Sequence, residues 1–207
     1  MLTGRVADPE ARSTARLQRG AGLIELMLAL LVFSVAMTGW LSVQVMAMQA
    51  SADALHRSVA TLLAQDLFSR LRANPGELGR YLGAGLGDAR RRQPLPATDC
   101  DREACTPDEL AVYDLWHWES LLLGELARSG GREVGGLPVA RACISREGQV
   151  ARLAIYWRGA PVAASLQGSL GCELPEEGLY DESAQPPGNQ HRRRALAVWG
   201  TVEHVRS

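Results

Sequence analysis

The chain contains no lysine, and its four histidines are scattered along 207 residues. Neither a Gly-x-Ser-x-Gly elbow nor a His-Glu-x-x-His motif is present, which argues against a serine hydrolase or a zinc protease. The chain has 22 arginines and 23 acidic residues, so its net charge is −1. It therefore lacks the excess of positive charge that is typical of nucleic-acid-binding proteins. We therefore expect no enzyme, no cofactor and no metal, and direct nucleic-acid binding is not indicated.

Long apolar stretches are also lacking, except over residues 21–43. As a helix this segment would cover roughly 33 Å at about 1.5 Å per residue, enough for a hydrocarbon core of about 30 Å. Glu25 is its one ionisable group, and a carboxylate in such a segment is costly enough to indicate a function. The excess of arginine in the preceding residues predicts a cytoplasmic N-terminus and export of the remainder.

Three interpretations of this segment compete. A secretory signal peptide would be cleaved near Ser34-Val35-Ala36, and a plain membrane anchor would not be cleaved at all. A class III signal would instead be cut between Gly20 and Ala21, which makes Glu25 the fifth residue of the mature chain. A secretory signal peptide or a plain anchor would gain nothing from a carboxylate at position 25. We therefore favour the class III signal, which explains why Glu25 is present.

The apolar helix is predicted to continue through residues 44–74 in amphipathic form, for about 50 residues and roughly 80 Å in all. The predicted stripe steps by three and four residues: Met48, Ala52, Leu55, Val59, Leu62, then Leu63, Leu67 and Leu71. Two ion pairs at i,i+4 spacing are expected, Asp53 with Arg57 and Asp66 with Arg70. The sequence Asn74-Pro75-Gly76 predicts that the helix ends there. We expect the rest of the chain to cover the stripe, with a coiled-coil stalk as the alternative.

Residues 75–207 are predicted to form an exported globular domain. Residues 79–99 have the glycines and prolines of a loop. A capping box at Thr106 and Glu109 begins a short helix, 106–128, whose apolar face runs from Ala111 to Leu126. Tyr113 and Trp116 lie beside that face and are expected to pack rather than to bind a ligand. Strands are predicted at 137–145, 150–158, 162–170 and 195–202, which gives an α+β fold with a long helix on a small antiparallel sheet.

Four cysteines are present at positions 100, 105, 143 and 172. Zinc binding through the Cys-x4-Cys spacing, with His117 and His191, is the alternative to disulfides. An even number in an exported chain favours disulfides, and four cysteines allow three connectivities. We favour the pairs closest in sequence, Cys100–Cys105 and Cys143–Cys172.

Three stretches resemble the type IV pilus minor pilins of the PilV, or pilus modification protein, class. They are residues 20–25 with the apolar run, residues 61–75 from Thr61 to Pro75, and residues 105–118 from Cys105 to Trp118. The first stretch is the prepilin motif shared by the whole superfamily, and the other two point to this class. The resemblance implies cleavage of leader 1–20 by a prepilin peptidase and N-methylation of Ala21. It also implies that Glu25 pairs with the N-terminal amine of an adjacent subunit during assembly.

The predicted function is a minor pilin that takes part in priming and assembly of a type IV pilus. The expected partners are prepilin peptidase, other minor pilins and the major pilin, the inner-membrane assembly platform and the lipid bilayer. The chain would cross the inner membrane once, with its C-terminal domain periplasmic, before it enters the pilus. The alternatives are a type II secretion pseudopilin, a membrane-anchored periplasmic enzyme, and adhesion or DNA capture through the arginine clusters at Arg90 or Arg192.

Overall fold

A computed structural model describes residues 22–83, 85–88, 92–160 and 193–202. The chain divides into two compact units, Met1–Met46 and Ala47–Ser207. Leader residues 1–20, Ala21, Cys172 and the predicted strand at 162–170 lie outside the described residues.

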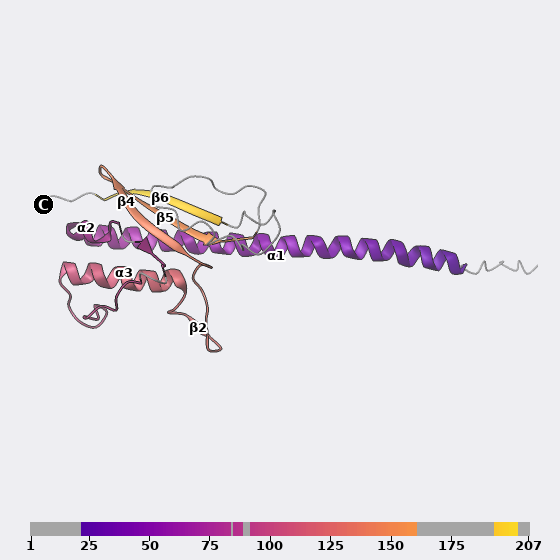
Figure 1. The fold of residues 1–207 in the computed structure, drawn as a ribbon, viewed down its shortest axis with the longest axis horizontal. Helices are drawn as coiled ribbons and strands as arrows, with labels where there is room; N and C mark the ends of the chain where they lie inside the picture. Colours follow the sequence, from indigo (N-terminus) through magenta and orange to yellow (C-terminus); the bar gives the residue numbers. More distant parts are fainter. Residues whose placement is uncertain (1–21, 84, 89–91, 161–192, 203–207) are drawn as a thin grey trace, which may run out of the picture. The chain divides into compact units, whose positions relative to one another are not determined.

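A long helix comes first in the chain, followed by a short helical turn, a second helix, a short strand, a third helix and the remaining strands (Figure 1). Their bounds are α1 Leu23–Ala73, η1 Pro75–Glu77, α2 Leu78–Tyr81, β1 Gly85–Leu86, α3 Pro107–Leu123, β2 Arg128–Ser129, β3 Arg132–Glu133, β4 Arg141–Glu147, β5 Val150–Arg158 and β6 Arg193–Thr201. Four strands form an antiparallel sheet in the order β1-β4-β5-β6, and β2 pairs with β3 in a separate hairpin.

The first unit consists, over residues 23–46, of the beginning of α1. Every described side chain there is exposed, and α1 contains an 18-residue window with a mean hydropathy of 2.1, none of it buried. By length and composition this helix can cross a membrane.

In the second unit the sheet lies on one side of α1 and α3 lies on the other (Figure 1). Their shared core takes six residues of the helix, all spaced by one, three or four positions: Ala60, Leu63, Ala64, Leu67, Phe68 and Leu71. The predicted stripe is thus only half right. Leu63, Leu67 and Leu71 are buried and Val59 is partly buried, whereas Met48, Leu55 and Leu62 are 74%, 62% and 64% exposed. The helix has two apolar faces, and the described part of its domain covers one of them.

The sheet turns the alternate residues of β5 toward that core. Leu153, Ile155 and Trp157 are almost fully buried there, as their alternation predicts. Ala154 and Tyr156, on the opposite face, are also buried, in a second cluster. On β6, Gly200 lets the ring of Phe68 approach the strand, since an added Cβ would lie 2.7 Å from that ring.

Several element boundaries differ from the sequence prediction. The helix expected at 106–128 ends at Leu123, because Gly124 adopts a left-handed conformation against the backbone of Gly135 and Gly136. Leu126 is consequently 47% exposed instead of continuing the buried face. The strand expected to begin at 137 begins at Arg141. The loop expected at 79–99 contains the end of α2 and strand β1.

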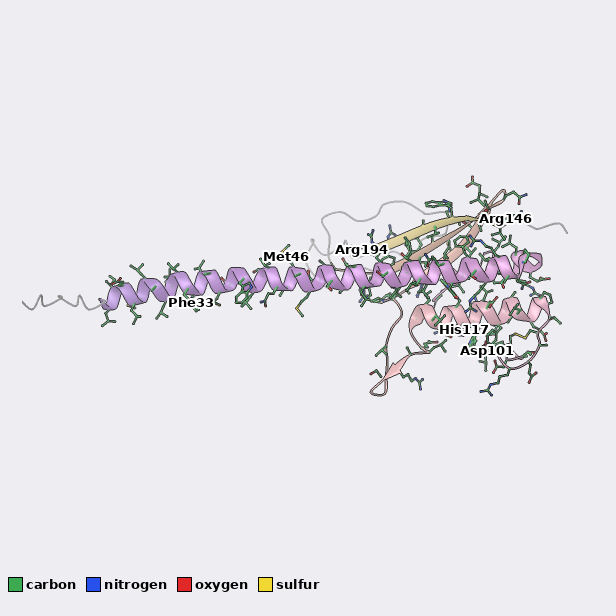
Figure 2. All side chains as sticks on the ribbon, turned by 180° about the vertical axis from the view of Figure 1, so that it is seen from behind. Phe33, Met46, Asp101, His117, Arg146 and Arg194 are labelled. Carbon is green, nitrogen blue, oxygen red and sulfur yellow. A yellow bond between two sulfur atoms is a disulfide. The ribbon has the colours of Figure 1, made fainter. Side chains whose placement is uncertain are left out.

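One of the two predicted helical ion pairs is confirmed. Arg70 Nε lies 2.8 Å from Asp66 Oδ2. Asp53 pairs with Arg194 of β6 at 2.6 Å, where the prediction had paired it with Arg57. Its other oxygen accepts the backbone N–H of Ala160 at 3.1 Å. Asp53 therefore joins the helix to β6, whose Arg194 is labelled in Figure 2.

Candidate assembly site

Glu25 lies in the first turn of α1, which begins at Leu23. Its backbone N–H donates to the carbonyl of Gly22 at 2.9 Å. The side chain is exposed among exposed apolar neighbours, with Ile24 and Leu26 on either side along the chain. A carboxylate in the first turn is favoured by the partial positive charge of the helix end. Gly20 and Ala21, the predicted cleavage and methylation sites, lie outside the described residues.

In the second unit, two of the stretches that carry the family resemblance meet at a buried carboxylate. Asp114 of α3 accepts from Arg70 Nη1 and from the Tyr81 hydroxyl, each at 2.7 Å. Arg70 also donates to Asp66 and lies 3.0 Å from His117 Nδ1. The carboxylate of Asp114 therefore joins α1, α2 and α3.

Two further contacts fasten the same helices. Asn74 is 5% exposed at the end of α1, and its amide donates to the carbonyl of Pro107 at 2.7 Å. Trp118, fully buried, donates from its indole N–H to the carbonyl of Leu63 at 2.8 Å. The motif residues Arg70, Asn74, Asp114 and Trp118 thus have a structural explanation, because they fix α3 on α1.

The electrostatics of this junction follow from burial and from its ion pairs. Burial and the hydrogen bond to Asp114 raise the pKa of Tyr81 well above its ordinary value. Burial opposes the charge of Arg70, yet its hydrogen bonds to Asp66 and Asp114 outweigh this and raise its pKa. Burial and the neighbouring charge of Arg70 lower the pKa of His117. All three effects keep Tyr81 and His117 neutral beside a charged Arg70.

Sequence reasoning missed a second buried carboxylate, that of Glu119. It accepts the backbone N–H groups of Gly87 and Gln93, each at 2.7 Å, and Arg92 Nε lies 3.3 Å away. Arg92 also forms a paired contact with Glu125 at 2.5 and 2.6 Å. The spacing offered a signal, because Glu119 follows Leu115 by four residues and so lies on the apolar face of α3.

The cysteines form disulfides where the structure describes them. Cys100 and Cys105 are joined to each other, the pairing favoured from the sequence, so they are not a zinc site with His117. Cys143 is also disulfide-bonded. Its predicted partner, Cys172, lies outside the described residues, and that pairing stays a prediction. Within the described ranges no three histidine, cysteine, aspartate or glutamate side chains gather as metal ligands.

Comparison with known proteins gives one family match. The family model described as Tt1218-like, "Type IV pilin Tt1218", matches residues 42–116. No curated protein and no solved structure matches. The matched range holds the second half of α1, the disulfide loop and the start of α3. Together with the long apolar helix on a small antiparallel sheet, the match supports a type IV pilin, without distinguishing the PilV class.

Proposed function

We propose that the chain is a minor pilin that primes and enters a type IV pilus. The observation that carries the proposal is Glu25, an ionisable side chain in the first turn of an otherwise apolar, exposed helix. The family match and the pilin-like fold support it. The proposed sequence of events is cleavage between Gly20 and Ala21 by a prepilin peptidase, methylation of the amine of Ala21, and entry into the fibre from the inner membrane.

Glu25 would then act in assembly rather than in catalysis. A carboxylate without a partner in hydrocarbon costs several kcal/mol. The amine of an adjacent subunit, freed by cleavage, would neutralise it. Because pairing requires the amine of one subunit to lie at the depth of Glu25 of its neighbour, only one register of the incoming helix relieves the cost. The partners are therefore other pilins, delivered by the inner-membrane assembly platform.

The unburied apolar face of α1 supports the same role. Met48, Leu55 and Leu62 recur every seven residues and stay exposed in the folded domain. A seven-residue apolar repeat on a helix is suited to packing against another helix. Contact with neighbouring pilin helices would bury this face, which the described residues of the globular domain leave exposed.

The decisive experiment compares Glu25→Ala with Gln44→Ala, which changes an exposed polar residue of the same helix. Intact mass and N-terminal sequencing of membrane-extracted protein report on processing, and the sheared pilus fraction reports on incorporation. We expect both variants to begin at Ala21 when the peptidase is present, and only Glu25→Ala to be depleted from pili. A native N-terminus at Met37, or normal incorporation of Glu25→Ala, would refute the proposal. Loss of protein secretion rather than of pili on gene deletion would favour a pseudopilin.

A further inference from the structure

A cavity of about 390 Å³ lies beside α3. Tyr113 and Trp116 of the helix line one side, and the chain from Leu95 to Arg102 lines the other. Asp101 and His117 mark this region on the α3 side of the molecule (Figure 2). Ligand sites have volumes of roughly 300–1,000 Å³, so the cavity suits a group of side-chain size. We call it the α3 pocket.

The wall of the α3 pocket is held in place by several independent links. The Cys100–Cys105 disulfide closes a short loop that contains two of the lining residues, Asp101 and Arg102. Asp101 accepts from the Tyr113 hydroxyl at 2.7 Å, which ties that loop to the helix. The N-terminal side of the wall is tied as well, through Thr98 and Glu109 at 3.2 Å. A wall fixed in this way loses little entropy when a ligand enters.

The pocket combines aromatic rings with negative charge. The rings of Tyr113 and Trp116 lie 5.8 Å apart at 52° to each other, and so form a corner. Two aspartates and one arginine line the pocket, which gives it a net charge of −1. Within the described ranges Asp101 accepts from Tyr113 through Oδ2 alone, so its second oxygen can take another donor. The hydrogen bond to Asp101 raises the pKa of Tyr113 to about 12, which keeps its hydroxyl a donor.

We propose that the α3 pocket binds an organic cation, the guanidinium or ammonium group of an arginine or lysine side chain presented by another protein. The cation would lie against the Trp116 ring and donate to Asp101. Aromatic faces attract cations, and carboxylate oxygens are their strongest hydrogen-bond acceptors. The sequence-based expectation that Tyr113 and Trp116 only pack is extended by this role. The proposal does not depend on Glu25 or on pilus assembly.

Arg102 acts in this scheme as an internal competitor. Its Nε lies 3.3 Å from Asp99 Oδ2, while its side chain is 84% exposed. An exposed pair of this kind is weak, so an incoming cation can displace it from the rim. Removal of Arg102 should therefore strengthen binding, whereas loss of a merely structural ion pair would leave binding unchanged or weaken it.

The test uses the full-length chain in an uncharged detergent, with ¹⁵N-labelled tryptophan and the Trp116 indole resonance assigned by Trp116→Phe. The probes are N-acetyl-arginine amide, N-acetyl-lysine amide, the isosteric but neutral N-acetyl-citrulline amide, and methyl glucoside. We expect saturable shifts with the two cations, with a Kd on the order of millimolar, and none with the neutral probes. Saturation with the glucoside alone would assign the pocket to carbohydrate and overturn the proposal. The absence of saturation by either cation, or equal binding of the citrulline probe, would overturn it too.

Three variants sharpen the test. Asp101→Asn still accepts from Tyr113, so the fold is kept, and we expect arginine binding to weaken by about fivefold, as for loss of one partly exposed ion pair. Arg102→Gln should strengthen it by a few-fold. Asp108→Asn is the matched control, because Asp108 lies on α3, pairs with Arg80 of α2 and does not line the pocket. Equal weakening in Asp101→Asn and Asp108→Asn, or weaker binding in Arg102→Gln, would contradict the proposal.

Discussion

Replacement of Asp114 by alanine should destabilise the second unit more than any exposed substitution of similar size. Asp114 is nearly buried and accepts from both Arg70 and Tyr81 at 2.7 Å. Alanine would leave the fully buried Tyr81 hydroxyl without its acceptor and would leave Arg70 with Asp66 as its remaining carboxylate. The substitution therefore removes the contact that holds α1, α2 and α3 together.

The size of the effect follows from the two donors. A buried donor left without an acceptor costs about 1–3 kcal/mol. The loss at Arg70 is smaller than the roughly 3–5 kcal/mol of a broken buried ion pair, because Arg70 keeps Asp66 and is 19% exposed. We expect Asp114→Ala to lower the free energy of unfolding by about 3 kcal/mol in total. Tyr81→Phe, which removes a donor instead, should cost about 1 kcal/mol.

Urea unfolding of the full-length chain in detergent, followed by tryptophan fluorescence, measures these changes, because Trp118 and Trp157 are buried reporters. A double-mutant cycle with Tyr81→Phe isolates the interaction free energy between Asp114 and Tyr81. In the Tyr81→Phe background Asp114→Ala should cost at least 1 kcal/mol less than in the wild type, since the orphaned hydroxyl is gone. Additive effects, or a single-mutant cost below about 1 kcal/mol, would refute the view that this carboxylate fastens the helices.

Three further predictions use the same unfolding assay. Stability should fall as the pH drops below 6.5, because the lowered pKa of His117 makes the unfolded state bind the proton first, and His117→Gln should flatten this dependence. Replacing Cys100 and Cys105 by serine should cost about 2 kcal/mol, the loop entropy of so short a bridge. Leu67→Ala should cost about 2–5 kcal/mol, whereas Leu62→Ala, on the exposed face, should stay within about 0.5 kcal/mol. A costly Leu62→Ala would show that this face is buried in the folded chain.

Local chemistry predicted much of the fold correctly. The capping box of Thr106 and Glu109 begins α3 as expected, because both of its hydrogen bonds are made within four residues. The alternation of β5 predicted Leu153, Ile155 and Trp157 on the core face for the same reason, since strand geometry fixes it. The pair of Asp66 with Arg70 also depends on spacing within one helix alone.

Features that depend on distant partners could not be obtained in this way. Asp53 pairs with Arg194, which is 141 residues away, in preference to the arginine one turn along the helix. The end of α3 is set by the close approach of Gly124 to Gly135 and Gly136, and this contact leaves no periodic signal. At the candidate site, the predicted prepilin motif is a local sequence pattern, and the roles of Gly20, Ala21 and Glu25 stay predictions. The α3 pocket, by contrast, exists only because the disulfide loop folds back onto Tyr113.

The misassigned stripe of α1 is the most instructive of these differences. Hydrophobic periodicity reports that a face is apolar, but not which molecule covers it. Leu62 and Leu63 are neighbours in sequence, yet Leu63 is buried by the domain and Leu62 is 64% exposed. A helix that needed only to support its own domain would gain nothing from the second apolar face, and exposed apolar surface is an aggregation liability. Two faces on one helix are what a subunit needs when the first is covered at folding and the second at assembly.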